Sequence, residues 1–234
     1  MKLSINILTL NNVDTLIDTL HVIKEEPIDK ETEVIIVDNG STDGCEDLAT
    51  ICNEKNLGIS IGKNQGIRAS KGEYILLLDG DVVPVKNSIR KLLEYMEANP
   101  ECKALGFFPT KFSAEKNRVG MSYHESICHT LFNPRPSRTA CLYYGIYHRS
   151  IFDVCMLDET GEYNGPGYGW EDHDFFRQMK EAGMTQWVCG MNYETGKYYH
   201  KINSSIRVMG HNQYVKSSEA RGRQYHEKWS KVNV

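Results

Sequence analysis

The sequence predicts an α/β fold with a mostly parallel central sheet, flanked by helices and followed by a smaller, less regular region. Three observations carry this prediction. Apolar runs alternate with segments of helical periodicity over residues 1–108. The run at residues 74–78 is continuously apolar or aromatic, as in strands covered on both faces. Clusters of Asp, Asn and Gly follow the apolar runs, as in the loops at the carboxyl ends of parallel strands.

The elements of the first half follow from these patterns in order. Aliphatic and β-branched runs predict strands at residues 4–10, 33–37, 73–78 and 103–108. Residues 13–24 have apolar side chains at 13, 16, 17, 20 and 23, which is a helical spacing. Further helices are expected at residues 45–53, 63–70 and 87–98, and a loop or short strand at 56–59. After Pro109 the pattern loosens, with short strand-like stretches at 120–123 and 140–147.

Length and composition place limits on the class of protein. The 234 residues suit one large domain, with 40% hydrophobic and 25% charged residues, as in soluble globular proteins. The net charge of −4 gives no reason to expect general nucleic-acid binding. The seven cysteines form no C-x-x-C pair, and no signal peptide is visible, so reduced thiols in a cytoplasmic protein are expected. No apolar run approaches the roughly 18 residues of a membrane span, so any membrane contact would be peripheral.

The last 38 residues are basic, with eight Lys or Arg against two Glu. Among their cations are Arg221, Arg223 and Lys228. Such a segment is able to face a diphosphate, an anionic membrane surface, nucleic acid or another anionic acceptor. The alternative is a solvated helix on an otherwise acidic protein, and the sequence leaves both open.

The most informative feature is the pair Asp79 and Asp81, which follows the apolar run at 74–78. Ligands of open α/β sheets bind at the carboxyl ends of the strands. Two carboxylates there, with Gly80 between them to allow close backbone approach, suit a hard divalent cation that also holds a diphosphate. The alternative is a loop with two solvated aspartates.

Five segments, in this order, resemble family-2-type glycosyltransferases with the GT-A fold: residues 6–12, 34–44, 56–75, 78–81 and 169–174. The resemblance implies a single domain with a nucleotide-sugar-binding half, residues 1–108, and an acceptor-binding half, residues 109–234. It implies a UDP-sugar donor and Mn²⁺ or Mg²⁺ at a D-x-D motif. Asp81 would bind the metal directly, and Asp79 would contact the ribose or the metal through water.

The resemblance also assigns the rest of the donor site. Asp38 would accept from the uracil imide N–H, and the residues at the two neighbouring strand ends would border the nucleotide, namely Thr9, Leu10, Asn11, Asn39 and Gly40. Turn formation is the alternative for Asn11. Lys63 and Asn64, at an expected helix start, would contact phosphate or ribose oxygens, and an N-cap is the alternative for Asn64.

A late histidine is often the third metal ligand in this family, and His200 fits that place, with a structural role as the alternative and His211 as the fallback. Lys201 and Arg207 would reach the diphosphate from a mobile lid.

On the acceptor side, residues 169–174 resemble the Trp-Gly-Gly-Glu-Asp type of galactosyltransferase motif, although Tyr168-Gly169-Trp170 replaces the Gly-Gly pair. The resemblance makes Asp172 the general base and lets Glu171 hold the acceptor, while Trp170 offers a flat face for a sugar ring. Stabilisation of a helix start is the alternative for the acids.

We therefore expect a metal-dependent, inverting hexosyltransferase that makes single additions to an acceptor hydroxyl. Its acceptor remains open among a glycan, a lipid-linked sugar, a protein and a nucleobase. The alternatives are a retaining GT-A transferase, a sugar-1-phosphate nucleotidyltransferase, and a non-catalytic carbohydrate- or nucleic-acid-binding module. A nucleotidyltransferase normally has a glycine-rich basic loop after its first strand, which residues 9–12 lack.

Overall fold

The computed structural model describes residues 1–28, 31–84, 86–107, 109–113, 121–126, 135–137, 142–167, 169–184, 186–189, 197–201 and 211–231. Within these ranges, the side chains of residues 107–137, 186–201 and 211 are outside the description.

The expected α/β architecture is confirmed, with a central sheet of eight strands between two layers of helices. The strand order is β3 (Ile51–Cys52), β2 (Thr32–Asp38), β1 (Leu3–Thr9), β4 (Tyr74–Asp79), β10 (Tyr144–His148), β6 (Ala104–Phe107), β11 (Gln186–Cys189) and β9 (Arg135–Ser137). The pairing directions make six strands parallel to one another, and only β10 and β9 run the other way. Because β10, β11 and β9 join strands from the first half, both halves of the chain build one sheet.

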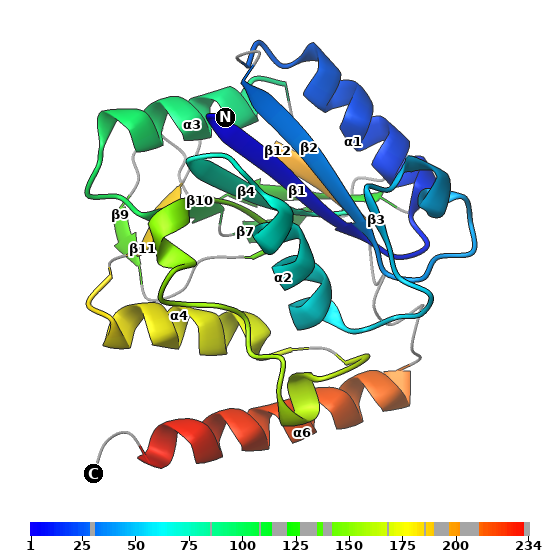
Figure 1. Ribbon diagram of the computed structural model, residues 1–234, viewed down its shortest axis with the longest axis vertical. Coiled ribbons are helices and arrows are strands. Elements are labelled where there is room, and N and C mark those ends of the chain that lie inside the picture. Colours follow the sequence, from blue (N-terminus) through cyan, green and yellow to red (C-terminus); the bar gives the residue numbers. More distant parts are fainter. Residues whose placement is uncertain are drawn as a thin grey trace.

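Helices cover both faces of this sheet (Figure 1). One face carries α1 (Val13–Glu25) and α3 (Ser88–Ala98), and the other carries α2 (Ile59–Ala69) and α4 (Glu171–Glu181). The helix α6 (His211–Ser230) lies outside α4 as an additional layer. Short 3-10 helices occur at η1 (Cys45–Leu48), η2 (Arg149–Ile151) and η3 (Gly161–Tyr163). Among the described residues, no helix is both long and apolar enough to cross a membrane.

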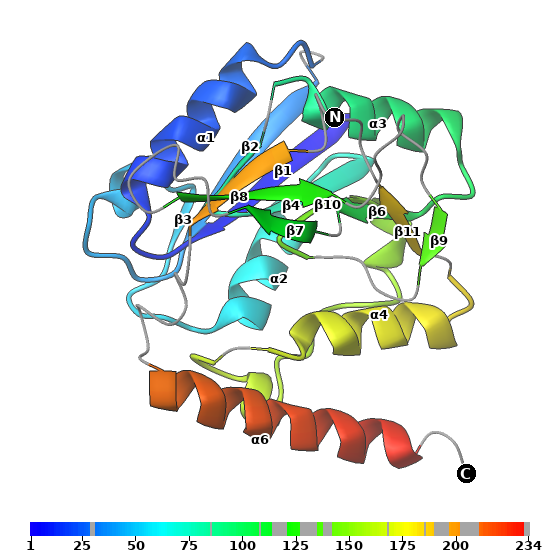
Figure 2. The same cartoon turned by 180° about the vertical axis from the view of Figure 1, so that it is seen from behind.

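A second, four-stranded antiparallel sheet stands beside the central one (Figure 2). Its order is β5 (Val82–Pro84), β12 (Lys197–Lys201), β8 (Met121–Ser126) and β7 (Pro109–Ser113). The strand β5 begins directly after Asp81, and its Val82 carbonyl accepts a hydrogen bond from Thr19 Oγ1 of α1 (2.9 Å). The chain therefore passes from the central sheet into the small sheet at the aspartate pair.

Two expected helices differ from the structure. The segment expected as a helix at 45–53 is instead the short η1 followed by β3. It is drawn into the sheet because its backbone bonds to the edge of β2: Thr50 N donates to Ile36 O, and Asn53 N donates to Asp38 O. The helix expected from residue 63 begins at Ile59. Its glycines are tolerated because they lie against strand β1: a Cβ at Gly66 would stand 1.8 Å from Asn6 Oδ1.

Two apolar clusters, one on each face of the central sheet, form the core. Leu76 and Leu78 of β4 point to the face covered by α1 and α3, and Ile75 and Leu77 point to the face that packs on Phe175 of α4. This alternation explains why the run at 74–78 is apolar at every position. All of these side chains are at most 1% exposed. A core of this kind fixes the ends of β1, β2 and β4, where the polar clusters lie.

Candidate active site

The carboxyl ends of β1, β2 and β4 meet at one edge of the sheet. In the strand registers, Thr9 lies opposite Asp38, and Leu8 lies opposite Asp79. Two backbone bonds extend the alignment past the strand ends, from Asn39 N to Thr9 O (2.9 Å) and from Gly80 N to Leu8 O (2.7 Å). Three segments distant in sequence thus present their polar residues side by side, as expected for a ligand site of an open α/β sheet.

Asp38 and the loop after β1 form one hydrogen-bonded unit. Asp38 is 1% exposed, and its carboxylate accepts bonds from the hydroxyl of Ser41 and from the backbone N–H of Ser41 (3.1 Å) and Gly40 (3.3 Å). Asn11 has a left-handed backbone (φ 53°), and its Oδ1 accepts from Thr42 N (2.9 Å). The turn-forming role considered for Asn11 is therefore present in the structure. Leu10 takes part through its carbonyl, which accepts from Asn12 Nδ2 (2.9 Å).

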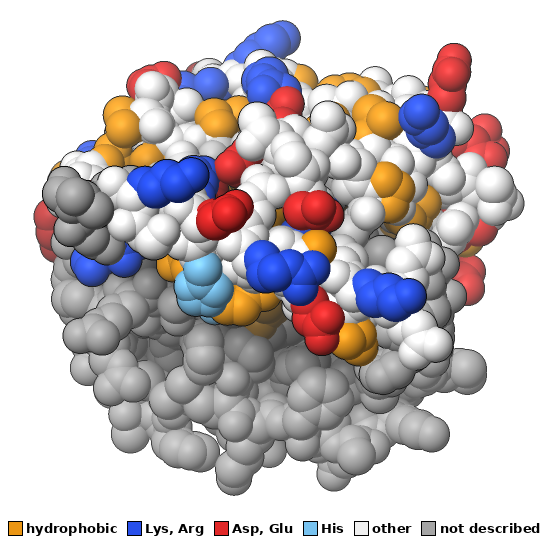
Figure 3. All heavy atoms as spheres, turned by 90° about the horizontal axis from the view of Figure 1, so that it is seen from below, with side chains coloured by type: hydrophobic (Ala, Val, Ile, Leu, Met, Phe, Trp, Pro, Cys, Tyr) orange, Lys and Arg blue, Asp and Glu red, His pale blue; other side chains and the backbone are white. Residues whose placement is uncertain are grey.

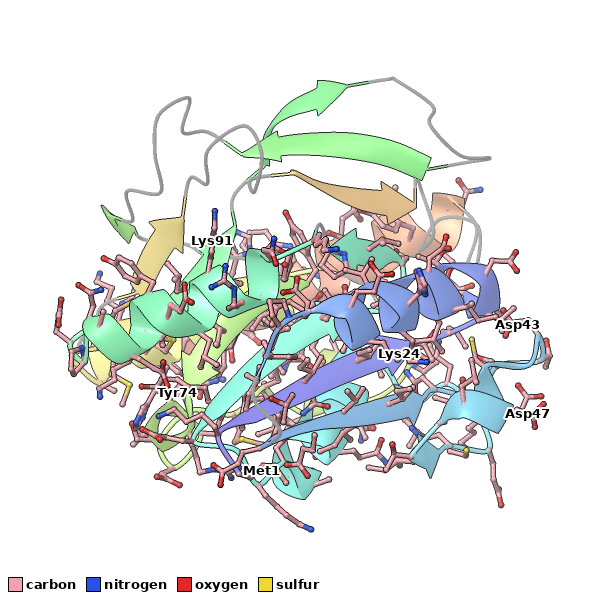
Figure 4. The ribbon with its side chains drawn as sticks, turned by 90° about the horizontal axis from the view of Figure 1, so that it is seen from above. Met1, Lys24, Asp43, Asp47, Tyr74 and Lys91 are labelled. Atoms are coloured by element: carbon pink, nitrogen blue, oxygen red, sulfur yellow. The ribbon has the colours of Figure 1, made fainter. Side chains whose placement is uncertain are left out.

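The loop after β2 also bonds to the start of α1, since Asp43 accepts a hydrogen bond from Val13 N (2.9 Å). Figure 4 shows Asp43 and Asp47 at this end of the sheet, with Tyr74 at the opposite end.

Asn39 and Gly40 fix the loop that leads into α2. Asn39 Nδ2 donates to Asn56 Oδ1 (3.0 Å) and Gly58 O (3.2 Å), and its Oδ1 accepts from Leu57 N (3.0 Å). A Cβ at Gly40 would stand 2.6 Å from the backbone of Lys55. Both residues are therefore engaged with neighbouring backbone in this structure, and nucleotide contact stays a prediction for them.

Lys63 and Asn64 lie in the second turn of α2 rather than at its start. The expectation of free helix N–H groups at these residues is wrong, because Gly58 is the N-cap and the helix begins at Ile59. Lys63 is 5% exposed and its ammonium bonds to Asp79 Oδ1 and to Leu142 O (3.2 Å). Asn64 is fully buried and holds the backbone of Leu157 through both amide atoms, at 2.8 and 3.2 Å.

The Asp79–Gly80–Asp81 turn is packed tightly against β1. A Cβ at Gly80 would stand 2.5 Å from Thr9 Oγ1, so this position has room for hydrogen only. The side chain of Asp79 is 33% exposed, whereas Asp81 is 7% exposed. The two carboxylates supply oxygen donors of the kind that Mg²⁺ and Mn²⁺ prefer. Among the described residues no three acids, histidines or cysteines form a complete metal cluster, so a cation here needs further ligands from a nucleotide, water or residues outside the description.

His200 lies next to this turn in the backbone register, because β12 pairs it with Val82, one residue after Asp81. Its side chain and that of Lys201 are outside the described residues, as are all of Arg207 and the side chain of His211. The register is compatible with the predicted metal role of His200, which stays a prediction.

The acceptor-side motif lies at the start of α4. Trp170 is the N-cap residue, in a left-handed conformation (φ 70°), and its ring centroid is 5.0 Å from that of His173 and 5.2 Å from those of Tyr225 and His226 on α6. Part of the indole is thus covered by α6.

Asp172 is 37% exposed and accepts from both the backbone N and the ring Nδ1 of His173, at 2.8 and 2.9 Å. The Asp172 hydrogen bond raises the pKa of His173.

Glu171 is the most perturbed acid of the site. Its side chain is 11% exposed and lies 3.2 Å from the guanidinium of Arg221. Burial, followed by the charge of Asp172, raises the pKa of Glu171 to about 7, while the charges of Arg221 and Lys63 oppose this. Because Lys63 also bonds to Asp79, one buried lysine stands between the donor-side and acceptor-side carboxylates.

The basic C-terminal segment is only partly a solvated surface. Arg221 is fully buried, and Lys228 pairs with Asp158 (2.8 Å) and with Asp174 (2.9 Å). These two cations are therefore engaged inside the protein, contrary to the interpretation that they face an anionic partner. The outer face around α6 mixes Lys and Arg with Asp and Glu side chains instead of forming an unbroken basic patch (Figure 3). Sequence reasoning missed Arg221 as a site residue, because a polar helix gives no signal that one arginine turns inward.

Two segments that sequence reasoning left unassigned also contribute to the site. Leu142 and Leu157 supply the backbone groups that hold Lys63 and Asn64.

The four described cysteine side chains, at 45, 52, 102 and 155, are free thiols.

The fold places acids at the carboxyl edge of the sheet and a second acidic motif at the start of α4, an arrangement typical of α/β proteins that bind a ligand at that edge. The profile of Glycosyl transferase family 2 matches residues 4–153, which is more than half of the chain. The chain belongs to this family and has the GT-A fold.

Relatives agree with this assignment. An uncharacterized glycosyltransferase of Bacillus subtilis, YfnE, is 30% identical over 118 residues, which is 46% of this chain and 30% of YfnE. Among solved structures, S. aureus TarS 1–349 superposes with a TM-score of 0.62 at 18% identity, over 89% of this chain and 64% of TarS. The mannosyltransferase PcManGT of Pyrobaculum calidifontis gives 0.58 at 16% identity, over 80% and 56%. The chain thus spans less than two thirds of these proteins.

Proposed function

We propose that the protein transfers a sugar from a UDP-sugar to an acceptor hydroxyl, with a divalent metal and with inversion at the anomeric carbon. One observation carries this proposal: Asp38, Asp79 and Asp81 share one edge of the sheet, and the ammonium of Lys63, which bonds to Asp79, also acts electrostatically on Glu171. The acids to which we assign donor binding and acceptor binding therefore lie on either side of one lysine.

On the donor side, Asp38 would accept from the uracil imide, with Thr9, Leu10, Asn11, Asn39 and Gly40 bordering the nucleotide. Asp79 and Asp81, with His200, would hold Mn²⁺ or Mg²⁺. When bound, such a cation neutralises the charge of the diphosphate leaving group. The burial of Asp81 and the ion pair of Asp79 with Lys63 favour carboxylates that are fixed before the ligand arrives. Lys201 and Arg207 would add positive charge at the diphosphate.

On the acceptor side, Asp172 would take the proton of the acceptor hydroxyl as its oxygen attacks the anomeric carbon. The bond from that carbon to the diphosphate oxygen breaks, and UDP leaves with the electron pair. Glu171 would hold the acceptor, and the uncovered part of the Trp170 ring would contact the sugar. The partial exposure of Asp172, at 37%, supports its role as the acid that meets an incoming acceptor.

Solved relatives support the donor class. TarS has been crystallised with UDP-GlcNAc and with UDP, and PcManGT with GDP-Man and Mn²⁺. The acceptor is a hydroxyl of a glycan, a lipid-linked sugar, a protein or a modified nucleobase.

The decisive experiment measures nucleotide release from a panel of UDP-sugars and GDP-mannose, with and without Mn²⁺. The comparison uses wild type, Asp81→Asn, and the matched control Asp47→Asn, an exposed aspartate on η1. We expect one UDP-sugar to be hydrolysed slowly, only with metal. Asp81→Asn should lose about 10²-fold or more of the rate, because a bound metal contributes several kcal/mol of charge stabilisation, and Asp47→Asn should lose none.

Metal-independent release, or an equal effect of both variants, would refute the metal site. The anomeric configuration of the released sugar, followed by proton NMR, tests inversion.

A further inference from the structure

The C-terminal helix α6 places one fully buried guanidinium against the acceptor-side motif. Arginine is almost never fully buried unless it is paired, and Arg221 has partners for each of its nitrogens. Nε donates to Glu162 O (3.0 Å), Nη2 donates to Gly165 O (3.2 Å), and Nη1 lies 3.2 Å from Glu171 Oε2. Its plane also lies over the Tyr163 ring, 5.4 Å from the centroid. A guanidinium held by so many contacts has one fixed orientation.

The loop that Arg221 holds also touches the donor half of the protein. A Cβ at Gly58 would stand 2.0 Å from the carbonyl oxygen of Gly165, so the two loops are in backbone contact. Gly58 O in turn accepts from Asn39 Nδ2 (3.2 Å) in the turn after β2. Arg221 therefore lies at one end of a continuous set of contacts that joins α6, the loop at 162–165 and the donor-side turn.

The titratable and charged groups around Glu171 come from four elements. Asp172 on α4 repels its carboxylate, whereas Lys63 on α2 and Arg221 on α6 attract it. The Tyr163 hydroxyl of η3 lies in the same environment, and burial together with the nearby acids raises its pKa, so it stays neutral. Among the described residues, Arg221 is the cation in hydrogen-bonding distance of Glu171, and so it contributes most directly to keeping this carboxylate charged and oriented.

We propose that Arg221 is a positioning residue of the transferase, acting through Glu171, so that α6 is a working part of the acceptor site. This inference rests on the proposed function, in which Glu171 holds the acceptor. Removal of the guanidinium would leave Glu171 beside Asp172, with Lys63 as the remaining nearby cation in the part of the chain that the structure describes. The carboxylate would then take up a proton at higher pH and lose its fixed direction. A displacement of about 1 Å in such a group costs on the order of 10²-fold in rate.

The test compares Arg221→Gln and Arg221→Lys with two control variants on the same helix. Lys228→Gln also removes a cation that holds α6, through Asp158 and Asp174, but not one that contacts Glu171. Arg223→Gln changes an exposed residue two positions away. Lys228→Gln therefore reports what a loosened helix does by itself.

Two readouts are needed. Glu171 is titrated by ¹³C NMR of its side-chain carboxyl, with Glu171→Gln to assign the signal. UDP release from UDP-GlcNAc is followed against pH with Mn²⁺ and with water as the acceptor probe, and the donor panel identifies a better donor if one exists.

In Arg221→Gln we expect the Glu171 midpoint and the acid limb of the rate profile to move together to higher pH, with a rate loss on the order of 10²-fold. Arg221→Lys should recover part of the rate, and neither control should move the midpoint or the limb. Arg221→Gln combined with Glu171→Gln should be no slower than Glu171→Gln alone.

An unmoved midpoint in Arg221→Gln, or an equal movement in Lys228→Gln, would overturn the inference. These outcomes differ from failure of the proposed function, which would appear as no metal-dependent UDP release by the wild type from any donor, while the NMR titration would still measure the coupling of Arg221 to Glu171.

Discussion

Replacement of Asp174 by alanine should loosen α6 from the rest of the protein. Asp174 is fully buried near the start of α4, and its carboxylate accepts from Lys228 Nζ (2.9 Å), Trp229 Nε1 (2.8 Å) and Gln178 Nε2 (2.8 Å). The first two donors lie on α6, so this one acid joins the two helices. Alanine retains helix propensity, and the change therefore isolates the loss of the carboxylate as a hydrogen-bond acceptor.

The expected loss of stability depends on which hydrogen-bond partners Lys228, Gln178 and Trp229 retain in the variant. Lys228 keeps Asp158 and is 34% exposed, so its loss is small because solvent screens the pair. Gln178 keeps its bond to Met156 O, whereas Trp229 Nε1 loses a charged acceptor. Hydrogen bonds to charged groups contribute about 1.5–3 kcal/mol each, and we expect a total of about 3 kcal/mol. For a chain of this size that corresponds to a Tm lower by about 6–12 °C.

The assay is thermal unfolding followed by circular dichroism and by tryptophan fluorescence. Asp153→Ala, at an exposed position, is the control. A double-mutant cycle with Lys228→Met separates the Lys228 contribution from that of Trp229. A fall in Tm of less than 2 °C, or one equal to that of the control, would show that Asp174 does not anchor α6.

Two further predictions concern buried groups and backbone conformation. Burial raises the pKa of Glu26, with partial compensation by backbone N–H groups at the start of α3, so the folded state binds this proton more tightly than the unfolded state. The destabilising negative charge of Glu26 should therefore develop as the pH rises from the ordinary carboxyl pKa of about 4.5 through the raised pKa of the folded state. Glu26→Gln should therefore raise the Tm at pH 7.5 but not at pH 4, with exposed Glu54→Gln as control, and a gain independent of pH would contradict this reasoning. Gly58→Ala should destabilise the protein more than Gly183→Ala. Both glycines have positive φ (92° and 73°), and left-handed strain alone costs about 1–2 kcal/mol, but only Gly58 would place its Cβ against another backbone segment. Equal losses of Tm would argue against the contact between Gly58 and Gly165.

The sequence was most informative where local pattern and burial agree. The strands β1, β2 and β4 and the helices α1 and α3 were predictable, because continuous apolar runs and 3.6-residue periodicity reflect the layers that cover them. The edge where Asp38 and Asp79 meet was predictable for the same reason, since parallel neighbours end at the same side of a sheet. The start of α2 was not, because Gly58 caps it without a side-chain bond and Gly62 and Gly66 weaken the helical pattern.

Features that depend on distant contacts were beyond the reach of local patterns. The antiparallel strand β10 enters between β4 and β6, although nothing in residues 144–148 indicates direction. The inward orientation of Arg221 depends on two backbone carbonyls about 56–59 residues earlier. The partner of Lys63 was likewise unforeseen, since the expected helix start gave the lysine a different environment.

The insertion of β10 has a consequence for synthesis on the ribosome. The strands β4 and β6 are made early, but the strand that lies between them is completed only with His148. Until then a nascent chain carries an open, apolar β4 edge with unpaired backbone groups, which is a template for pairing with other chains. Fragments that stop near residue 108 should accordingly aggregate or be held by chaperones, and the sheet should close in one late, cooperative step as the second half of the chain emerges.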